Sequence, residues 1–195
     1  KAFKNCICLE EIEMLNVVHI GENAFYGCYL LNEIFIPRTT EIGEAAFAEC
    51  LSLVKIEAPE IKSIESYAFY GCISLESVCY LNEISQINDF TFFNCNSLKE
   101  INLPETVSYI CIGAFSQCES LKEIEIPSSV ESIGYAAFHN CLSLEIITFK
   151  EPCNISYIEN EAFEGCCSLR GIFVPSSVTS ITNNNFPQNS ELIKT

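Results

Sequence analysis

Several residue types are rare in this sequence of 195 residues, which has no tryptophan, one methionine, two histidines and a single aspartate, Asp89. Calcium loops of the EF-hand and glycine-rich β-roll kinds need several aspartates at close spacing, so this scarcity excludes both. Only 10 residues are Lys or Arg, against 26 that are Asp or Glu, and the formal net charge is −16. A chain of this charge repels phosphate groups, so nucleic acid and anionic membrane surfaces are poor partners.

Other absences concern membranes and chemistry. No apolar run reaches the roughly 20 residues that a transmembrane helix needs, so we expect no direct membrane insertion. The sequence lacks Gly-x-Ser-x-Gly, His-Glu-x-x-His, Gly-x-Gly-x-x-Gly and phosphate-loop motifs, which mark common hydrolases, metalloproteases and nucleotide-binding proteins. It also lacks a Cys-x-x-Cys pair, the usual start of a zinc site. We therefore expect no catalytic residues, no metal and no cofactor.

The sequence does contain a repeated pattern, Ala-Phe-x-x-Cys, which occurs eight times with threonine in place of alanine once. A ninth, altered copy consists of Asn185, Phe186 and Asn189. The phenylalanines of the pattern are Phe3, Phe25, Phe47, Phe69, Phe92, Phe115, Phe138, Phe163 and Phe186. They are 22, 22, 22, 23, 23, 23, 25 and 23 residues apart, and a nearly constant period of this length predicts a solenoid.

Each repeat continues after its cysteine with apolar residues in the pattern Leu-x-x-Ile-x-Ile. The leucines are Leu9, Leu31, Leu53, Leu75, Leu98, Leu121, Leu144 and Leu169. The last two apolar positions alternate with other residues, which is the period of a half-buried strand. Another isoleucine stands five residues before the next phenylalanine, and in three repeats glycine follows it (Gly21, Gly43 and Gly134), which predicts a tight turn.

These patterns together predict an α/β repeat solenoid of about eight repeats, in which stacking buries the apolar positions that one repeat alone leaves exposed. We expect a parallel β-sheet on one face and short helical or 3₁₀ turns, formed by Ala-Phe-x-x-Cys, on the other. Residues 1–181 form the predicted solenoid, and residues 182–195 form a degenerate last repeat or a tail. The chain opens within a repeat, so we expect it to be a fragment of a longer protein.

The 13 cysteines fall into two groups. Those of the repeated pattern are expected to stack as one small buried residue per coil: Cys6, Cys28, Cys50, Cys72, Cys95, Cys118, Cys141 and Cys166. Their Cβ bonds should run parallel, which is poor geometry for a disulfide. The others are Cys8, Cys79, Cys111, Cys153 and Cys167. Because they are odd in number, they cannot all pair with one another.

The best candidate for a binding site is the outer side of the predicted sheet, where residues between the apolar positions point to solvent. Its candidate ligand-binding residues are Glu33, Phe35, Lys55, Glu57, Glu100, Asn102, Glu123, Glu125 and Phe173. An exposed aromatic residue within a polar rim is a plausible anchor for a partner. The alternative is that most of these glutamates only keep an apolar-rich solenoid soluble.

One further candidate concerns a modification. Asn154, Ile155 and Ser156 form the acceptor pattern for N-glycosylation, and they lie where two extra residues lengthen one repeat. Such triplets are common by chance.

The repeat resembles the BspA-like, or Treponema pallidum-type, class of leucine-rich repeats. The segment 121–127 together with 130–141 matches the pattern of that class at every position, and the resemblance covers residues 1 to about 181. It implies a cell-surface or secreted adhesin-like protein that binds host or matrix proteins, and it implies no catalytic residue.

Two alternatives stay open. The chain is either an intracellular scaffold for protein–protein interaction, since unpaired cysteines suit a reducing cytoplasm, or the recognition arm of a larger enzyme. The sequence does not determine the oligomeric state.

Overall fold

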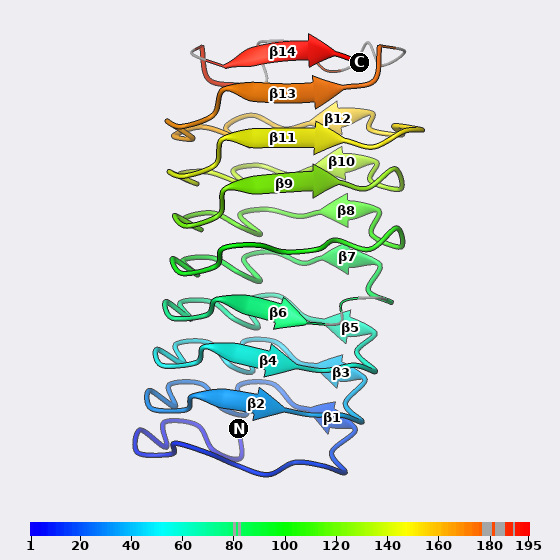
Figure 1. Cartoon of the computed structure of the whole chain (residues 1–195). Coiled ribbons are helices and arrows are strands. Elements are labelled where there is room, and N and C mark those ends of the chain that lie inside the picture. Colours follow the sequence, from blue (N-terminus) through cyan, green and yellow to red (C-terminus); the bar gives the residue numbers. More distant parts are fainter. Residues whose placement is uncertain (80, 82, 177–180, 182–185, 189) are drawn as a thin grey trace.

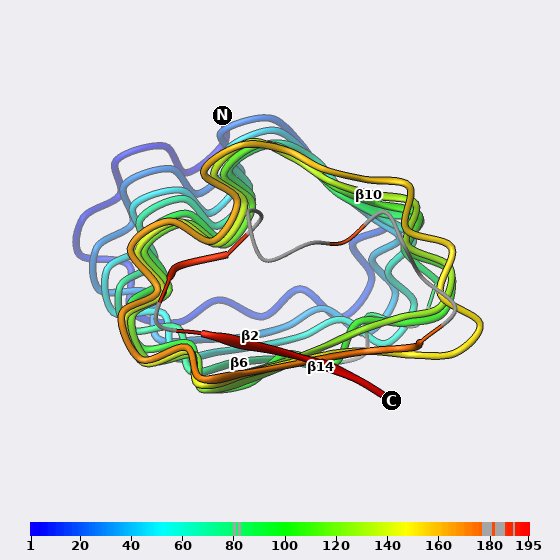
Figure 2. The same cartoon turned by 90° about the horizontal axis from the view of Figure 1, so that it is seen from above.

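In the computed structural model the chain winds as a stack of coils, with the N-terminus in the first coil and the C-terminus in the last (Figure 1). The structure describes residues 1–79, 81, 83–176, 181, 186–188 and 190–195. Viewed along the stack, successive coils follow similar paths, and the first coils are displaced sideways from the later ones (Figure 2). The predicted solenoid is therefore confirmed.

The strand predicted from Leu-x-x-Ile-x-Ile is present in most coils, and these strands form what we call the face sheet. Its strands are β2 (Glu33–Phe35), β4 (Lys55–Glu57), β6 (Ser77–Cys79), β9 (Glu123–Ile126), β11 (Ile146–Phe149), β13 (Gly171–Val174) and β14 (Glu191–Lys194). Pairing is parallel and in register, as between Ile34 and Ile56 or Ile124 and Ile147. The face sheet has two hydrogen-bonded parts, β2-β4-β6 and β9-β11-β13-β14.

A second set of short parallel strands, which we call the back sheet, lies behind the face sheet in Figure 1. Its strands are β1 (His19–Ile20), β3 (Glu41–Ile42), β5 (Ser63–Ile64), β7 (Gln86–Ile87), β8 (Tyr109–Ile110), β10 (Ser132–Ile133) and β12 (Tyr157–Ile158). It also has two parts, β1-β3-β5 and β7-β8-β10-β12. The sequence analysis predicted only one strand per coil, because a two-residue strand leaves no alternation to recognise.

The core is formed by the predicted apolar columns. The phenylalanine rings stack from Phe3 to Phe186, with successive centroids between 5.0 and 5.6 Å apart. The leucines from Leu31 to Leu169 are fully buried, whereas Phe3 in the first coil is 36% exposed. Each coil thus buries its apolar residues against its two neighbours, as expected for a repeat array.

The predicted helical turns are wrong, because no helix occurs among the described residues. Instead, the segment around Ala-Phe-x-x-Cys forms three overlapping four-residue turns. In one coil the Ala46 N–H donates to the Gly43 carbonyl at 3.1 Å, and the Cys50 N–H donates to the Phe47 carbonyl at 3.2 Å. These are the hydrogen bonds of β-turns, which close after three residues rather than four.

Two features of these turns prevent a helix. The third residue of the first and of the last of these turns has a left-handed backbone conformation, as at Ala45 (φ 50°) and Glu49 (φ 60°), and one such residue interrupts a right-handed helix. Other N–H groups bond to the neighbouring coil, as where the Phe47 N–H donates to the Ala68 carbonyl at 2.8 Å. Backbone donors that join coils are unavailable for bonds within one coil.

Replacing Ala45 by glycine is expected to stabilise the chain by about 0.5–1 kcal/mol, since glycine adopts a left-handed conformation without steric cost. The neighbouring change Ala46→Gly should destabilise it by about 1 kcal/mol, because Ala46 has no such conformation and its methyl group is fully buried. Urea denaturation of both variants measures the difference. A helical turn would make both changes destabilising, and that result would contradict the turn geometry.

The glycines predicted to form tight turns do lie there, but Gly43 and Gly134 are required for another reason, whereas a Cβ atom at Gly21 would meet no atom within 4 Å. Gly43 begins a turn and does not have a positive φ. A Cβ atom at this position would lie 2.8 Å from the backbone nitrogen of Glu22 in the preceding coil. Glycine at this position therefore permits close approach of two backbones.

The cysteines of the repeated pattern bridge neighbouring coils. The Cys50 thiol donates to the Phe25 carbonyl of the preceding coil at 3.2 Å, and the Cys72 thiol donates to the Phe47 carbonyl at 3.1 Å. The cysteines from Cys28 to Cys166 are fully buried. Burial in this column raises the pKa of Cys50 to about 12. A small residue with one weak donor thus fills the column and satisfies a carbonyl of the preceding coil.

The back sheet is interrupted between the coils of Phe69 and Phe92, and the face sheet is interrupted across the coil that follows Phe92, which has no assigned strand in the part of the chain that the structure describes. Among the described residues no strand pairing joins β5 to β7 or β6 to β9, and between Phe69 and Phe92 the repeat lengthens from 22 to 23 residues. Two pairs of outer rings stack between the coils of Phe69 and Phe92, with centroids 5.2 Å apart for Tyr67 and Phe90 and 4.8 Å apart for Tyr70 and Phe93. These outer rings replace part of the contact that the missing strand pairs provide elsewhere.

The last part of the chain is described only in part, and Asn185 and Asn189 of the altered repeat lie outside the described residues. The Phe186 ring packs on Phe163 at 5.0 Å, and β14 pairs with β13 in parallel. The division into residues 1–181 and 182–195 stays a prediction.

Candidate functional site

The candidate site lies on the outer side of the face sheet, where the predicted residues come from successive strands. Parallel register places them in two rows. The first row contains Glu33, Lys55, Ser77, Glu123, Ile146 and Gly171, and the second contains Phe35, Glu57, Cys79, Glu125, Thr148 and Phe173. Glu100 and Asn102, in a coil without an assigned strand, are exposed between the two parts of the sheet. The predicted alternation is therefore present in β2, β4, β9 and β11, whereas the residues of β6 are all half-buried and Gly171 of β13 is buried.

The N-terminal end of this face is hollowed. A depression of about 750 Å³ is lined by predicted residues (Glu33, Phe35, Lys55 and Glu57) and by Glu11, Glu13 and Leu15 of the first coil. The Phe35 side chain is 51% exposed and Leu15 is 44% exposed. A second depression of about 620 Å³ shares Glu11 and Glu33 with the first and adds Glu10, Leu30 and Asn32. Because the two depressions share Glu11 and Glu33, we call them together the N-terminal groove.

The charge in this groove is mainly negative. Its one ammonium group, on Lys55, forms an ion pair with Glu57, and the hydrogen bond between them raises the pKa of Lys55. In the part of the chain that the structure describes, Glu10, Glu11 and Glu13 form no ion pair. Carboxylates without a cation therefore face solvent beside exposed apolar side chains.

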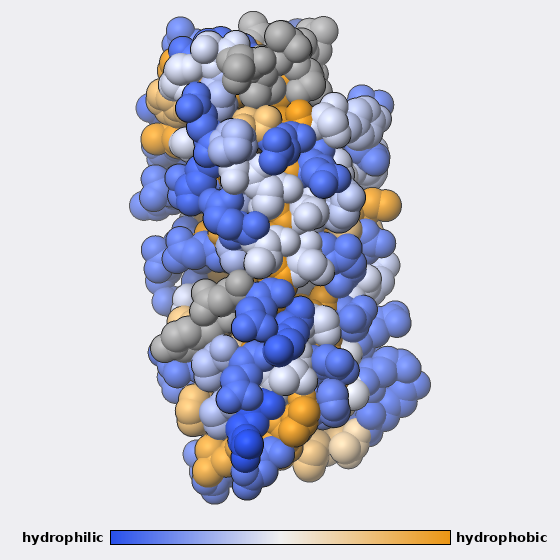
Figure 3. All heavy atoms as spheres, turned by 90° about the vertical axis from the view of Figure 1, so that its right-hand side faces the viewer, coloured by the Kyte–Doolittle hydropathy of each residue, from blue (hydrophilic) through white to orange (hydrophobic). Residues whose placement is uncertain are grey.

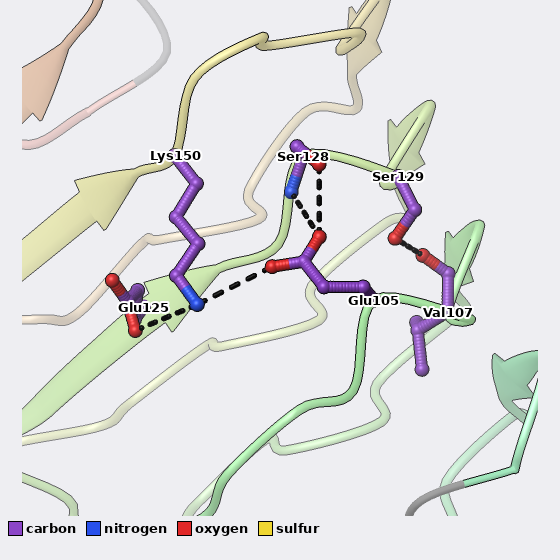
Figure 4. A network of polar contacts seen from close by, with 6 residues as sticks. All are labelled: Glu105, Val107, Glu125, Ser128, Ser129 and Lys150. Carbon is purple, nitrogen blue, oxygen red and sulfur yellow. Dashed lines mark hydrogen bonds and ion pairs between the residues drawn. The ribbon is translucent and has the colours of Figure 1, made fainter.

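The middle of the face differs, because cations of the chain itself lie beside its carboxylates. Here Glu100, Asn102, Glu123 and Glu125 line a smaller depression of about 270 Å³. The Lys150 ammonium lies 3.2 Å from a carboxylate oxygen of Glu125, as drawn in Figure 4.

The same ammonium lies 3.3 Å from Glu105, so it joins three successive coils. The Ser128 hydroxyl and backbone N–H donate to the other oxygen of Glu105 at 2.8 and 3.0 Å. Hydrogen bonds from Ser128 and Lys150 lower the pKa of Glu105, and those of Glu125 and Glu105 raise the pKa of Lys150. This network fixes neighbouring coils relative to one another and occupies charges that a partner would otherwise contact.

Phe173 lies farther along the face and is less exposed than Phe35. Its ring lies over Gly171 of the same strand, where a Cβ atom would be 3.1 Å from a ring carbon. The structure thus separates the predicted residues into an N-terminal group, a middle group and Phe173, rather than gathering all of them into one site.

Several residues of this surface were not among the predicted site residues. Leu15 and Leu30 extend the N-terminal groove, but their positions fall in turns where the sequence shows no alternation. Lys150 was also missed, since its contact with Glu105 depends on which coils are neighbours. The outer rings at residues 67, 70, 90 and 93 give a sequence signal, because aromatic residues occupy the same two positions of two successive repeats.

The remaining surface adds little to the candidate site. Asn154 of the glycosylation pattern is exposed, and the Ser156 hydroxyl donates to the Glu131 carbonyl at 3.0 Å. The side of the molecule drawn in Figure 3 is mostly hydrophilic, with isolated apolar groups. Among the described residues no group of His, Cys, Asp or Glu could hold a metal ion, and no helix is long and apolar enough to cross a membrane.

Comparisons with known proteins agree with this architecture. The family model described as BspA type Leucine rich repeat region matches residues 1–110 and 62–193, in six copies. No curated protein matches the chain.

Two crystal structures are similar to the chain over most of its length. A leucine-rich repeat protein from Bacteroides ovatus is 30% identical with a TM-score of 0.84, over 98% of this chain and 49% of that one. A leucine-rich repeat protein from T. pallidum is 30% identical with a TM-score of 0.72, over 82% of this chain and 75% of that one. The chain thus spans about half the length of the B. ovatus chain.

Proposed function

Because the chain belongs to the BspA-type leucine-rich repeat family, we propose that it is a non-catalytic module that binds protein ligands through the outer side of its face sheet. The observation that carries this proposal is the N-terminal groove, in which Phe35 is half exposed among carboxylates. The pattern phenylalanines from Phe25 to Phe163 are buried, so an exposed phenylalanine on a strand needs a separate explanation. A surface of rigid stacked strands suits macromolecular recognition.

The predicted residues contribute unequally to this function. Phe35 is the proposed anchor, with Glu33, Lys55 and Glu57 as its polar surroundings, because anchors act best within a rim of polar residues. Residues of the middle group and Phe173 extend the contact surface. The resemblance supports host or matrix proteins as ligands and a cell-surface or secreted location, and we propose both.

Replacing Phe35 by glutamate is expected to weaken ligand binding by at least about tenfold, since a charge replaces the apolar anchor. The stability of the fold should change by less than about 0.5 kcal/mol, because the side chain points to solvent. The test screens purified matrix and serum proteins for saturable binding to the chain and then compares the variants by biolayer interferometry.

The matched control is Tyr157→Glu on the back sheet, where the replaced ring is 58% exposed. It should leave the affinity unchanged. Loss of binding in the control with full binding in the Phe35 variant would place the ligand on the other sheet and contradict the proposal.

A second candidate, an intracellular scaffold, is favoured by one observation. The pattern cysteines from Cys28 to Cys166 are free thiols, and their Sγ atoms are the hydrogen-bond donors of the column. Free thiols persist in a reducing compartment. Biotinylation of intact cells with a reagent that does not cross membranes separates the candidates, since labelling supports the surface protein and protection until lysis supports the scaffold.

A further inference from the structure

The N-terminal groove has a composition that specifies more than a generic protein partner. Its carboxylates come from Glu10, Glu11, Glu13, Glu33 and Glu57. Those of Glu11 and Glu33 line both depressions, between Leu30 in one and Phe35 in the other. Leu30 marks one end, and Phe35 with Leu15 marks the other, each of the three being between 44% and 51% exposed. Along the direction of the strand, the groove thus presents an apolar end, then negative charge, then a second apolar end.

We propose that this groove binds an extended basic peptide segment, with Lys or Arg side chains between two apolar residues. This inference rests on the proposed function and names the class of partner for the same face. A lysine or arginine that enters near the Phe35 ring gains both a carboxylate and the face of an aromatic ring, two interactions that favour cations. The single ammonium of the groove, Lys55, is neutralised by Glu57 and does not compete.

The length of the groove limits the length of the segment. Leu30 and Phe35 are five residues apart, and because Leu30 lies in a turn, their separation is at most the roughly 17 Å that a fully extended chain of this length spans. A peptide of about six residues in the same conformation spans this distance.

The negative charge of the N-terminal groove favours a basic peptide over other possible occupants. A second copy of the chain carries the same net charge of −16 and is repelled. The middle of the face is less suitable for a basic segment, because Lys150 already lies beside Glu125 and Glu105. The N-terminal groove keeps its carboxylates available, and therefore its complement is positive.

The test measures binding of fluorescent six-residue peptides to the whole chain by anisotropy. The first peptide has apolar ends and four Lys or Arg residues between them, the second has glutamates in place of these, and the third has serine at both ends. We expect the first to bind at least about tenfold more tightly than the others and to lose affinity as salt rises.

Variants locate the binding. The double change Glu11→Gln with Glu33→Gln, and separately Phe35→Ser, should each weaken binding of the first peptide by about tenfold. The matched control, Glu44→Gln with Glu164→Gln, removes the same charge from exposed positions in the turns and should change affinity by less than about twofold.

Equal loss in both double variants would show that binding follows net charge alone and would overturn the inference. Absence of saturable peptide binding would also overturn it. In that case the proposed function still stands if the Phe35→Glu variant loses binding of a protein ligand. Failure of the peptide inference is therefore distinguishable from failure of the proposed function.

Discussion

Raising the pH above 9 is expected to unfold the array steeply, because the buried cysteine column must stay protonated. An exposed thiol in the unfolded chain ionises near pH 9, whereas burial raises the pKa of Cys50 to about 12. Burial raises the pKa of Cys72, Cys95, Cys118 and Cys141 as well. The folded state therefore retains protons that the unfolded state releases.

The sign of the effect follows from these directions. Each of these thiols has a higher pKa in the folded state, so its contribution to stability is complete below pH 9 and decreases as the pH rises above 9, for Cys50 up to about pH 12. Each such thiol removes about 1.4 kcal/mol of unfolding free energy per pH unit in this window. Several thiols acting together exceed the stability of an ordinary domain within two or three pH units.

Urea denaturation at a series of pH values, followed by circular dichroism, measures this slope. In the double variant Cys95→Val with Cys118→Val, the slope should fall by about two protons, because two groups no longer titrate. Tyrosine and lysine side chains also titrate at alkaline pH. They are the same in both proteins, so their contribution to the slope is the same. An unchanged slope would show that alkaline unfolding comes from surface charge and not from the cysteine column.

Replacing Phe92 by alanine is expected to lower the unfolding free energy by about 3–5 kcal/mol, since the cavity left in a stacked column cannot collapse. Its side chain is fully buried, and its ring stacks on Phe69 and Phe115 at centroid distances of 5.5 and 5.4 Å. The position also lies where the back sheet is interrupted and next to the coil without a face-sheet strand, so strand pairing compensates little there. Chemical denaturation of the purified variant measures the loss.

The matched control is Phe3→Ala, at the end of the same column. Phe3 is 36% exposed, and within the described part of the chain its ring stacks on Phe25 alone. Its replacement should lower the unfolding free energy by less than half as much as Phe92→Ala, because part of the Phe3 ring is already in solvent. Equal costs at both positions would contradict the assignment of one continuous, internally buried column.

The parts of the fold that could be predicted are those in which the same residue type occupies the same position of each repeat. The buried positions of leucine, phenylalanine and cysteine recur at constant spacing, so the columns, the parallel register and the outward direction of Phe35 followed from the pattern. The structure contains these features because each coil packs against a neighbouring coil with the same residue pattern.

The predicted helical turn failed for a physical reason. The left-handed positions that replace a helix hold many residue types, among them Asn5, Gly27 and Glu49 at one site of the repeat. Glycine and asparagine recur there and are typical of left-handed turns, but glutamate at the same position hides that signal.

The candidate site was predictable only in part. Alternation placed Glu33 and Phe35 on the outside, yet it gave no sign that the N-terminal end is hollow while Lys150 occupies the middle. Such differences depend on side chains from coils that are distant in the sequence, as with Lys150 and Glu105.

The most direct test of the account is hydroxyl-radical footprinting of the chain with and without its bound ligand, using either a matrix protein from the screen or the basic peptide. The account predicts that the ligand protects Phe35, Leu30 and Leu15 from oxidation and leaves the equally exposed back-sheet residues Tyr109 and Tyr157 unprotected. Protection of the back-sheet tyrosines with continued oxidation of Phe35 would contradict the claim that the face sheet is the binding surface.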